Sequence, residues 1–79
     1  MTLEHLRSVR DASPFVPFTI YQADGRLHRV PHRDFLSLPP SGRMIIVHHP
    51  DESFSLIDLL LVTELRVDPV PVATSEPVR

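Results

Sequence analysis

Cysteine, tryptophan and lysine are absent from this 79-residue chain, and glycine occurs only twice. The absence of cysteine excludes disulfides and thiolate metal sites. With only Gly25 and Gly42, the chain has no glycine-rich loop of the kind that holds phosphates. No apolar run approaches the roughly 18–20 residues that a membrane-spanning helix needs, and the charged N-terminus lacks the hydrophobic region of a secretion signal. The sequence therefore predicts a cytoplasmic protein that does not enter a membrane.

Catalytic and metal-binding patterns are missing as well. No serine has an assigned base nearby, and so short a chain has little room for a ligand pocket of about 300 Å³ or more. His28 and His32 would lie about 13 Å apart along an extended strand. His48 and His49 are adjacent and would point to opposite faces of a strand. We therefore expect no enzyme activity, no cofactor and no metal site.

The start of the chain predicts a short helix over residues 2–12. Thr2 can cap this helix, and Leu3, Leu6 and Val9 fall on one stripe that must pack against something. Pro14 prevents the helix from continuing. The sequence thus begins with a helix that is stable only when it docks on the rest of the domain.

The remainder of a single domain over residues 1–67 reads as β-structure. Asp24-Gly25 supplies the positive-φ position that a hairpin turn needs between two β-branched and aromatic runs. Residues 68–79 contain three prolines and no large apolar side chain, which predicts a disordered tail. The predicted strands cover about residues 18–23, 26–31, 43–49, 53–58 and 61–67.

The segment LIDLLLVTELRV, residues 56–67, admits two interpretations. Ser55 and Asp58 form a capping-box-like pair that would begin a helix. Alternatively, two strands flank a bend at Asp58, which explains the aspartate as a turn residue rather than a buried charge. We favour the strands. In that interpretation Phe54 and Leu56 point inward while Ser53 and Ser55 point outward. The residues expected to share one face after the bend are Leu61, Thr63, Leu65 and Val67.

A helix followed by five short strands, with a tight turn before the last, resembles the Sm/Hfq-like small barrels. The run DLLLVTEL occupies the place of that family's second conserved block. The chain is also similar to short bacterial proteins of uncharacterised function that share the phrases PFxPFxI, ADGR, VPHxDF, PxGR and IDLLLVT. The resemblance implies a mainly β fold, an N-terminal helix plus a five-stranded SH3-like or Sm-like barrel.

In the Sm-like family the last two strands of neighbouring subunits pair to form a ring. This resemblance implies an oligomer interface at Leu59, Leu60, Val62 and Glu64. Self-association also suits a chain this small, because its core alone supplies little stability and no disulfide reinforces it. We therefore expect a non-catalytic protein–protein interaction or self-assembling module, with a homo-oligomer or another protein as partner.

The alternative is a divergent Sm/Hfq-like RNA-binding ring. The densest cationic run is RLHRVPHR, and the candidate nucleic-acid contacts are Tyr21, Arg26, His28, Arg29 and Arg33. The net charge of −2 and the neighbouring Asp24 and Asp34 argue against such a surface. In Hfq-like proteins a lysine–histidine pair lies in the second block, where this chain has Leu59 and Leu60.

Overall fold

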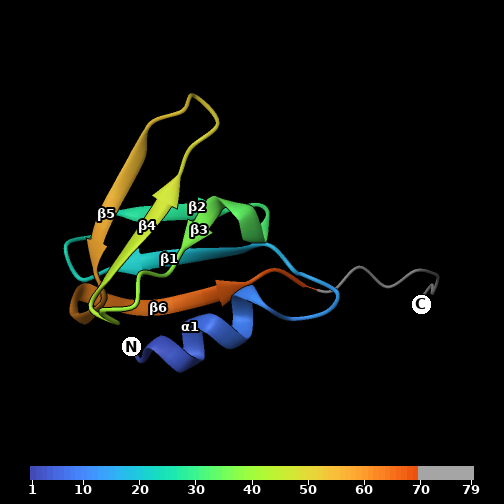
Figure 1. The fold of residues 1–79 in the computed structure, drawn as a ribbon, viewed down its shortest axis with the longest axis horizontal. Helices are drawn as coiled ribbons and strands as arrows, with labels where there is room; N and C mark the ends of the chain where they lie inside the picture. Colours follow the sequence, from blue (N-terminus) through green and yellow to red (C-terminus); the bar gives the residue numbers. More distant parts are fainter. Residues whose placement is uncertain (70–79) are drawn as a thin grey trace.

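The computed structural model describes residues 1–69, which form an N-terminal helix and six strands in two three-stranded antiparallel sheets (Figure 1). The strand orders are β2-β1-β6 and β3-β4-β5. The elements in chain order are α1 (Leu3–Arg10), β1 (Phe18–Gln22), β2 (Leu27–Val30), the 3-10 turn η1 (Arg33–Phe35), β3 (Leu36–Ser37), β4 (Met44–His48), β5 (Phe54–Asp58), the 3-10 turn η2 (Leu59–Leu61) and β6 (Val62–Val67). The predicted helix and β-rich body are confirmed, but a two-residue strand, β3, raises the number of strands from five to six.

Helix α1 begins where the sequence places its cap. The Thr2 hydroxyl accepts a hydrogen bond from the backbone N–H of His5 at 3.2 Å. Leu6 is completely buried, and Leu3 and Val9 pack against the core beside it. The predicted apolar stripe therefore docks the helix on the sheets, as an eight-residue helix requires. No helix within residues 1–69 has the length and apolar character to cross a membrane.

The core lies between the inner faces of the two sheets. Every large side chain in it is aliphatic or aromatic, and among the described residues no polar or charged one is buried with them. Alternate residues of each central strand point into it, as the two-residue period of a strand requires. The buried residues are Leu6, Phe18, Ile20, Val30, Leu36, Ile45, Val47, Ile57, Leu59 and Val62.

The aliphatic segment near the C-terminus forms two strands joined by a bend. β5 ends at Asp58, η2 follows, and β6 begins at Val62. The Asp58 carboxylate caps η2 by accepting a hydrogen bond from the backbone N–H of Leu60 at 2.9 Å. The strand interpretation of this segment is confirmed, the continuous helix is excluded, and the aspartate is a turn residue.

The predicted sidedness of β6 is confirmed for residues 64–67 but wrong for residues 61–63, because the strand contains a β-bulge. Tyr21 pairs with Glu64 while the next residue of β1 pairs with Val62, so Thr63 is an extra residue in β6. The Thr63 hydroxyl bonds to the carbonyl of Tyr21 at 3.3 Å. A bulge reverses the alternation of side chains. Val62 is therefore buried, Leu65 faces the core opposite Ile20, and both Thr63 and Leu61 are exposed.

Asp68, the first residue of the predicted tail, is held against the domain. Its backbone N–H donates a hydrogen bond to the carbonyl of Pro17 at 2.9 Å. Its carboxylate accepts hydrogen bonds from both terminal nitrogens of Arg29. This bidentate hydrogen bonding lowers the pKa of Asp68. The end of β6 is thus fixed to β2 and to the segment before β1. Residues 70–79 of the predicted tail lie outside the described residues.

Candidate interaction surface

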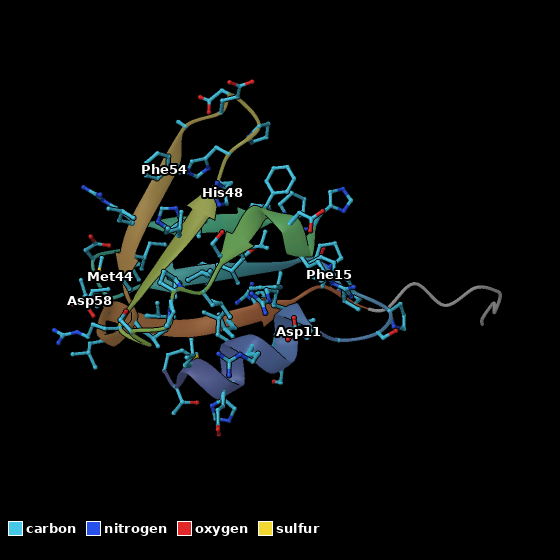
Figure 2. All side chains as sticks on the ribbon, viewed as in Figure 1. Asp11, Phe15, Met44, His48, Phe54 and Asp58 are labelled. Carbon is cyan, nitrogen blue, oxygen red and sulfur yellow. The ribbon has the colours of Figure 1, made fainter. Side chains whose placement is uncertain are left out.

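The outer face of the β3-β4-β5 sheet is apolar along most of the β4–β5 pair. Since Ile45 and Ile57 point into the core, their chain neighbours point outward. The outward cross-strand pairs are Met44 with Asp58, Ile46 with Leu56, and His48 with Phe54. Figure 2 shows His48 and Phe54 toward one end of the hairpin, with Met44 and Asp58 at the other. We call Met44, Ile46, Phe54 and Leu56 the apolar face.

The β5 side of the apolar face is the more exposed. Phe54 is 60% and Leu56 61% exposed, whereas Met44 and Ile46 are half-buried. β4 lies between two strands, but within residues 1–69 β5 pairs with β4 alone. Phe54 and Leu56 therefore lack neighbours on one side. A contiguous exposed apolar surface of this kind marks an interaction site more often than isolated exposed side chains do.

Polar groups bound the apolar face at both ends. At one end His48 Nε2 lies 2.9 Å from the Ser37 hydroxyl, and its ring is 6.5 Å from that of Phe54. At the other end Arg43 binds the Asp58 carboxylate at 3.2 and 3.3 Å. These bonds from Arg43, with that from the Leu60 amide, lower the pKa of Asp58. An apolar centre with a hydrogen-bonded polar rim is the usual composition of a protein interface.

The backbone of β5 presents unpaired groups at its outer edge. The His49 amide donates to the Ser53 carbonyl at 2.9 Å, and the Leu59 amide donates to the Arg43 carbonyl at 2.7 Å. Hydrogen-bonded pairs alternate with non-bonded pairs in an antiparallel ladder. The pairs of Leu56 with Ile46 and of Phe54 with His48 are thus non-bonded, and the N–H and C=O groups of Leu56 and Phe54 point away from β4.

The four residues expected at an oligomer interface lie in two environments. Leu60 is 68% exposed and Glu64 is also exposed, so their side chains can contact a partner. Leu59 is only 4% exposed, and Val62 is similarly buried. The side chains of Leu59 and Val62 belong to the core of the chain itself, which leaves Leu60 and Glu64 as the accessible members of the predicted set.

Sequence reasoning missed Phe54 and Leu56, and the expectation that both point inward is wrong. It is Ser55 that lies on the inner face, opposite Val47, with its hydroxyl 2.8 Å from His49 Nε2. A signal for the correct orientation was present in the sequence. Asp58 lies two and four residues after Leu56 and Phe54, so the three side chains share one face of the strand. A charged side chain that stays solvated identifies that face as the outer one.

The residues expected to contact nucleic acid do not come together. Tyr21 and Arg29 lie on the outer face of the β2-β1-β6 sheet, since their partners in the ladder point outward. His28 lies opposite the buried Ile20 and so faces the other way. The Tyr21 ring lies 5.6 Å from the guanidinium of Arg66.

The two remaining arginines of the cationic run have local partners. Arg26 lies 3.6 Å from the carboxylate of Asp24 in the hairpin turn. Arg33 donates to the carbonyls of Arg10 and Ala12, at 3.3 and 2.6 Å, and ties η1 to the end of α1. Arg33 thus has a structural role, and the run RLHRVPHR does not form one basic surface.

Two histidines meet between the sheets. The rings of His28 and His49 lie 6.1 Å apart, His28 Nε2 is 2.8 Å from the Gln22 side-chain oxygen, and His49 is bound to Ser55 as described above. Burial, followed by the proximity of His49, lowers the pKa of His28. No cluster of three or more histidine, aspartate or glutamate side chains suited to a metal ion occurs in residues 1–69. Each of the two histidines is instead held by a neighbouring polar side chain, Gln22 for His28 and Ser55 for His49.

Comparisons with protein-family models, curated proteins and solved structures find no match.

Proposed function

We propose that this chain is a non-catalytic protein–protein interaction module of the cytoplasm that self-associates through the apolar face. The observation that supports the proposal most strongly is the exposure of Phe54 and Leu56 on a strand that pairs on one side only within the described residues. Exposed apolar edge strands promote uncontrolled pairing unless something covers them. A specific partner that pairs with the edge of β5 beside the apolar face removes that hazard.

The apolar face offers enough free energy for such a contact. Removing a fully exposed Phe or Leu side chain from water contributes about 1.5–3 kcal/mol. Because Phe54 and Leu56 are about three-fifths exposed, covering each would contribute about 1–2 kcal/mol. The half-buried Met44 and Ile46 add to this sum. A contact of two chains would bury two such surfaces.

The same proposal includes the finer description of the fold, an SH3-like or Sm-like small barrel made from the two sheets. The order of elements supports it, since a helix precedes the strands and a 3-10 turn separates the last two. RNA binding, the function of Hfq-like proteins, receives no support from the scattered positions of Arg26, Arg29 and Arg33. Leu59, at one of the positions of the Hfq-like lysine–histidine pair, is buried.

Light scattering on a matched pair of variants tests the proposed function. Leu56→Asp places a charge in the apolar face, and Leu27→Asp places the same charge on the outer face of the other sheet, at a leucine that is 56% exposed. We expect Leu56→Asp to weaken self-association at least about tenfold, the equivalent of 1.4 kcal/mol, and Leu27→Asp to leave it unchanged. Circular dichroism checks that both variants are folded. Equal effects of the two charges would contradict the proposal.

A second experiment separates assembly from RNA binding. Replacing Arg26, Arg29 and Arg33 by glutamate removes the contacts of Arg29 with Asp68 and of Arg33 with the end of α1, so circular dichroism must first show that the variant is folded. The particle mass of an assembly module should then be unchanged. An RNA-binding ring would instead lose affinity for single-stranded RNA, with a strong dependence on salt concentration. Salt-dependent binding of RNA that the three substitutions abolish would replace the proposed function with the alternative.

A further inference from the structure

We infer that the partner is a second copy of this chain, whose β5 pairs antiparallel with the first β5, at the edge of the apolar face, about a two-fold axis at Leu56. The inference rests on the proposed function and adds the identity of the partner, the register and the symmetry. It differs from a ring, in which each subunit would use two different edges. A two-fold contact uses the same edge twice and closes at two chains.

The backbone of β5 is suited to pairing with itself. The hydrogen-bonding alternation directs the N–H and C=O groups of Phe54 and Leu56, and the N–H of Asp58, toward the free edge, while the Asp58 carbonyl begins η2. These residues are spaced evenly about Leu56. In an antiparallel pair centred there, Leu56 bonds to Leu56 of the second copy, and Phe54 bonds to Asp58 of the second copy. This register pairs the N–H and C=O groups of the two Leu56 residues with each other and the Phe54 carbonyl with the Asp58 N–H of the second copy.

The side chains and charges agree with this register. The sheet would extend through both copies, so that two apolar faces form one continuous surface with the two Leu56 side chains at its centre. The only charge on β5 is Asp58, which Arg43 already binds. The two Asp58 residues would lie about 14 Å apart along the paired strands, beyond the screening length of about 8–10 Å. Phe54 of the second copy would lie beside Arg43, a favourable neighbour for an aromatic ring.

The edge of β6 is a poorer partner for β5. Glu64 and Arg66 occupy the outer face of β6 and form an ion pair at 3.6 Å. Pairing β5 with β6 of another copy would place Phe54 and Leu56 beside these charged side chains. It would also place the bulge at Thr63 in the new ladder, where the register shifts by one residue. The β5 edge has no bulge, and its one charged residue, Asp58, is already bound by Arg43.

The size of the contact predicts its strength. One five-residue edge per copy forms a small contact, of the kind made by weak and transient interfaces that bury less than about 1,200 Å² in total. We therefore expect a dimer with a dissociation constant in the micromolar range. Such a dimer would exchange readily, which allows its register to be trapped chemically.

Single-cysteine variants of the full chain test the register, because the natural sequence contains no cysteine. Leu56→Cys and Phe54→Cys are matched, since the two side chains are equally exposed on the same face of one strand. Bonded residues of an antiparallel pair have Cα atoms about 5.5 Å apart, within the disulfide range of about 4.4–6.8 Å. The two copies of residue 54 would lie about 14 Å apart, too far for a disulfide. Under mild oxidation Leu56→Cys should form a covalent dimer at least about tenfold faster than Phe54→Cys.

Each outcome has a definite meaning. Fast trapping at residue 56, together with a particle mass of two chains for the unmodified protein by light scattering, supports the two-fold dimer. Equal trapping at residues 54 and 56, or faster trapping at 54, overturns it. If light scattering shows the unmodified chain to be oligomeric in the same experiment, the proposed function survives and only the register and symmetry fail. A chain that stays monomeric at high micromolar concentration overturns both.

Discussion

The carboxylate of Asp58 accepts a hydrogen bond from the backbone N–H of Leu60 at 2.9 Å while Arg43 binds the same carboxylate from the start of β4. One side chain thus ends β5, caps η2 and links the bend to the neighbouring strand. The bend sends the chain from one sheet to the other. This relationship explains why an aspartate interrupts the most aliphatic segment of the sequence.

Replacing Asp58 by alanine should lower the free energy of unfolding, because the cap and the Arg43 pair are lost together. Asp58→Asn keeps a side-chain oxygen that can accept from the Leu60 amide and should therefore lose less stability. Urea unfolding followed by circular dichroism measures both variants. Equal losses would mean that the Arg43 pair, rather than the cap, supplies the stability.

The neighbours Leu59 and Leu60 should respond very differently to truncation. Leu59 is buried in the core, so Leu59→Ala should cost about 2–5 kcal/mol of unfolding free energy. Leu60 is exposed, so Leu60→Ala should change the stability of the monomer by no more than about 0.5 kcal/mol. Urea titrations at low protein concentration report both values. A larger loss at Leu60 than at Leu59 would show that the bend is assigned incorrectly.

Acidification should destabilise the fold through His28. Its pKa is lowered in the folded state from the ordinary 6.5, so the unfolded chain takes up the proton first as the pH falls. The stability associated with His28 is therefore present above pH 6.5 and is lost as the pH falls from there toward the folded pKa. Urea midpoints between neutral and mildly acidic pH should fall in the natural chain and fall less in His28→Gln. His5→Gln, on the exposed side of α1, is the control.

Two turn residues with positive φ should respond in opposite directions. Glu52 has φ of 74°, a conformation that costs a residue with a side chain about 1–2 kcal/mol, so Glu52→Gly should raise the unfolding free energy by up to about 1 kcal/mol. Gly25 has φ of 91°, so Gly25→Ala should lower the unfolding free energy by about 1 kcal/mol. Thermal unfolding measures both. A stabilising alanine at residue 25 would contradict the hairpin geometry.

Local signals predicted the elements of the fold but not the orientation of every side chain. The turn at Asp24-Gly25 and the bend at Asp58 could be predicted because each residue type has a specific conformational reason to be there. The bulge at Thr63 depends on pairing between β6 and β1, which are far apart in the sequence. β3 has only two residues, too few for a periodic pattern.

The candidate surface was harder to predict for a related reason. Period-two alternation groups Phe54 with Leu56 but does not say which face of the strand is buried. The aliphatic density of residues 59–62 indicated an interface, yet Leu59 and Val62 fill the core. Only the contacts between the two sheets separate core side chains from surface side chains in so apolar a segment.

Sedimentation equilibrium of the unmodified chain tests self-association most directly. Self-association through β5 should raise the mean mass from one chain toward two as the concentration increases through the micromolar range, while Leu56→Asp should remain at one chain over the same range. A mass of one chain for the unmodified protein at high micromolar concentration would contradict it.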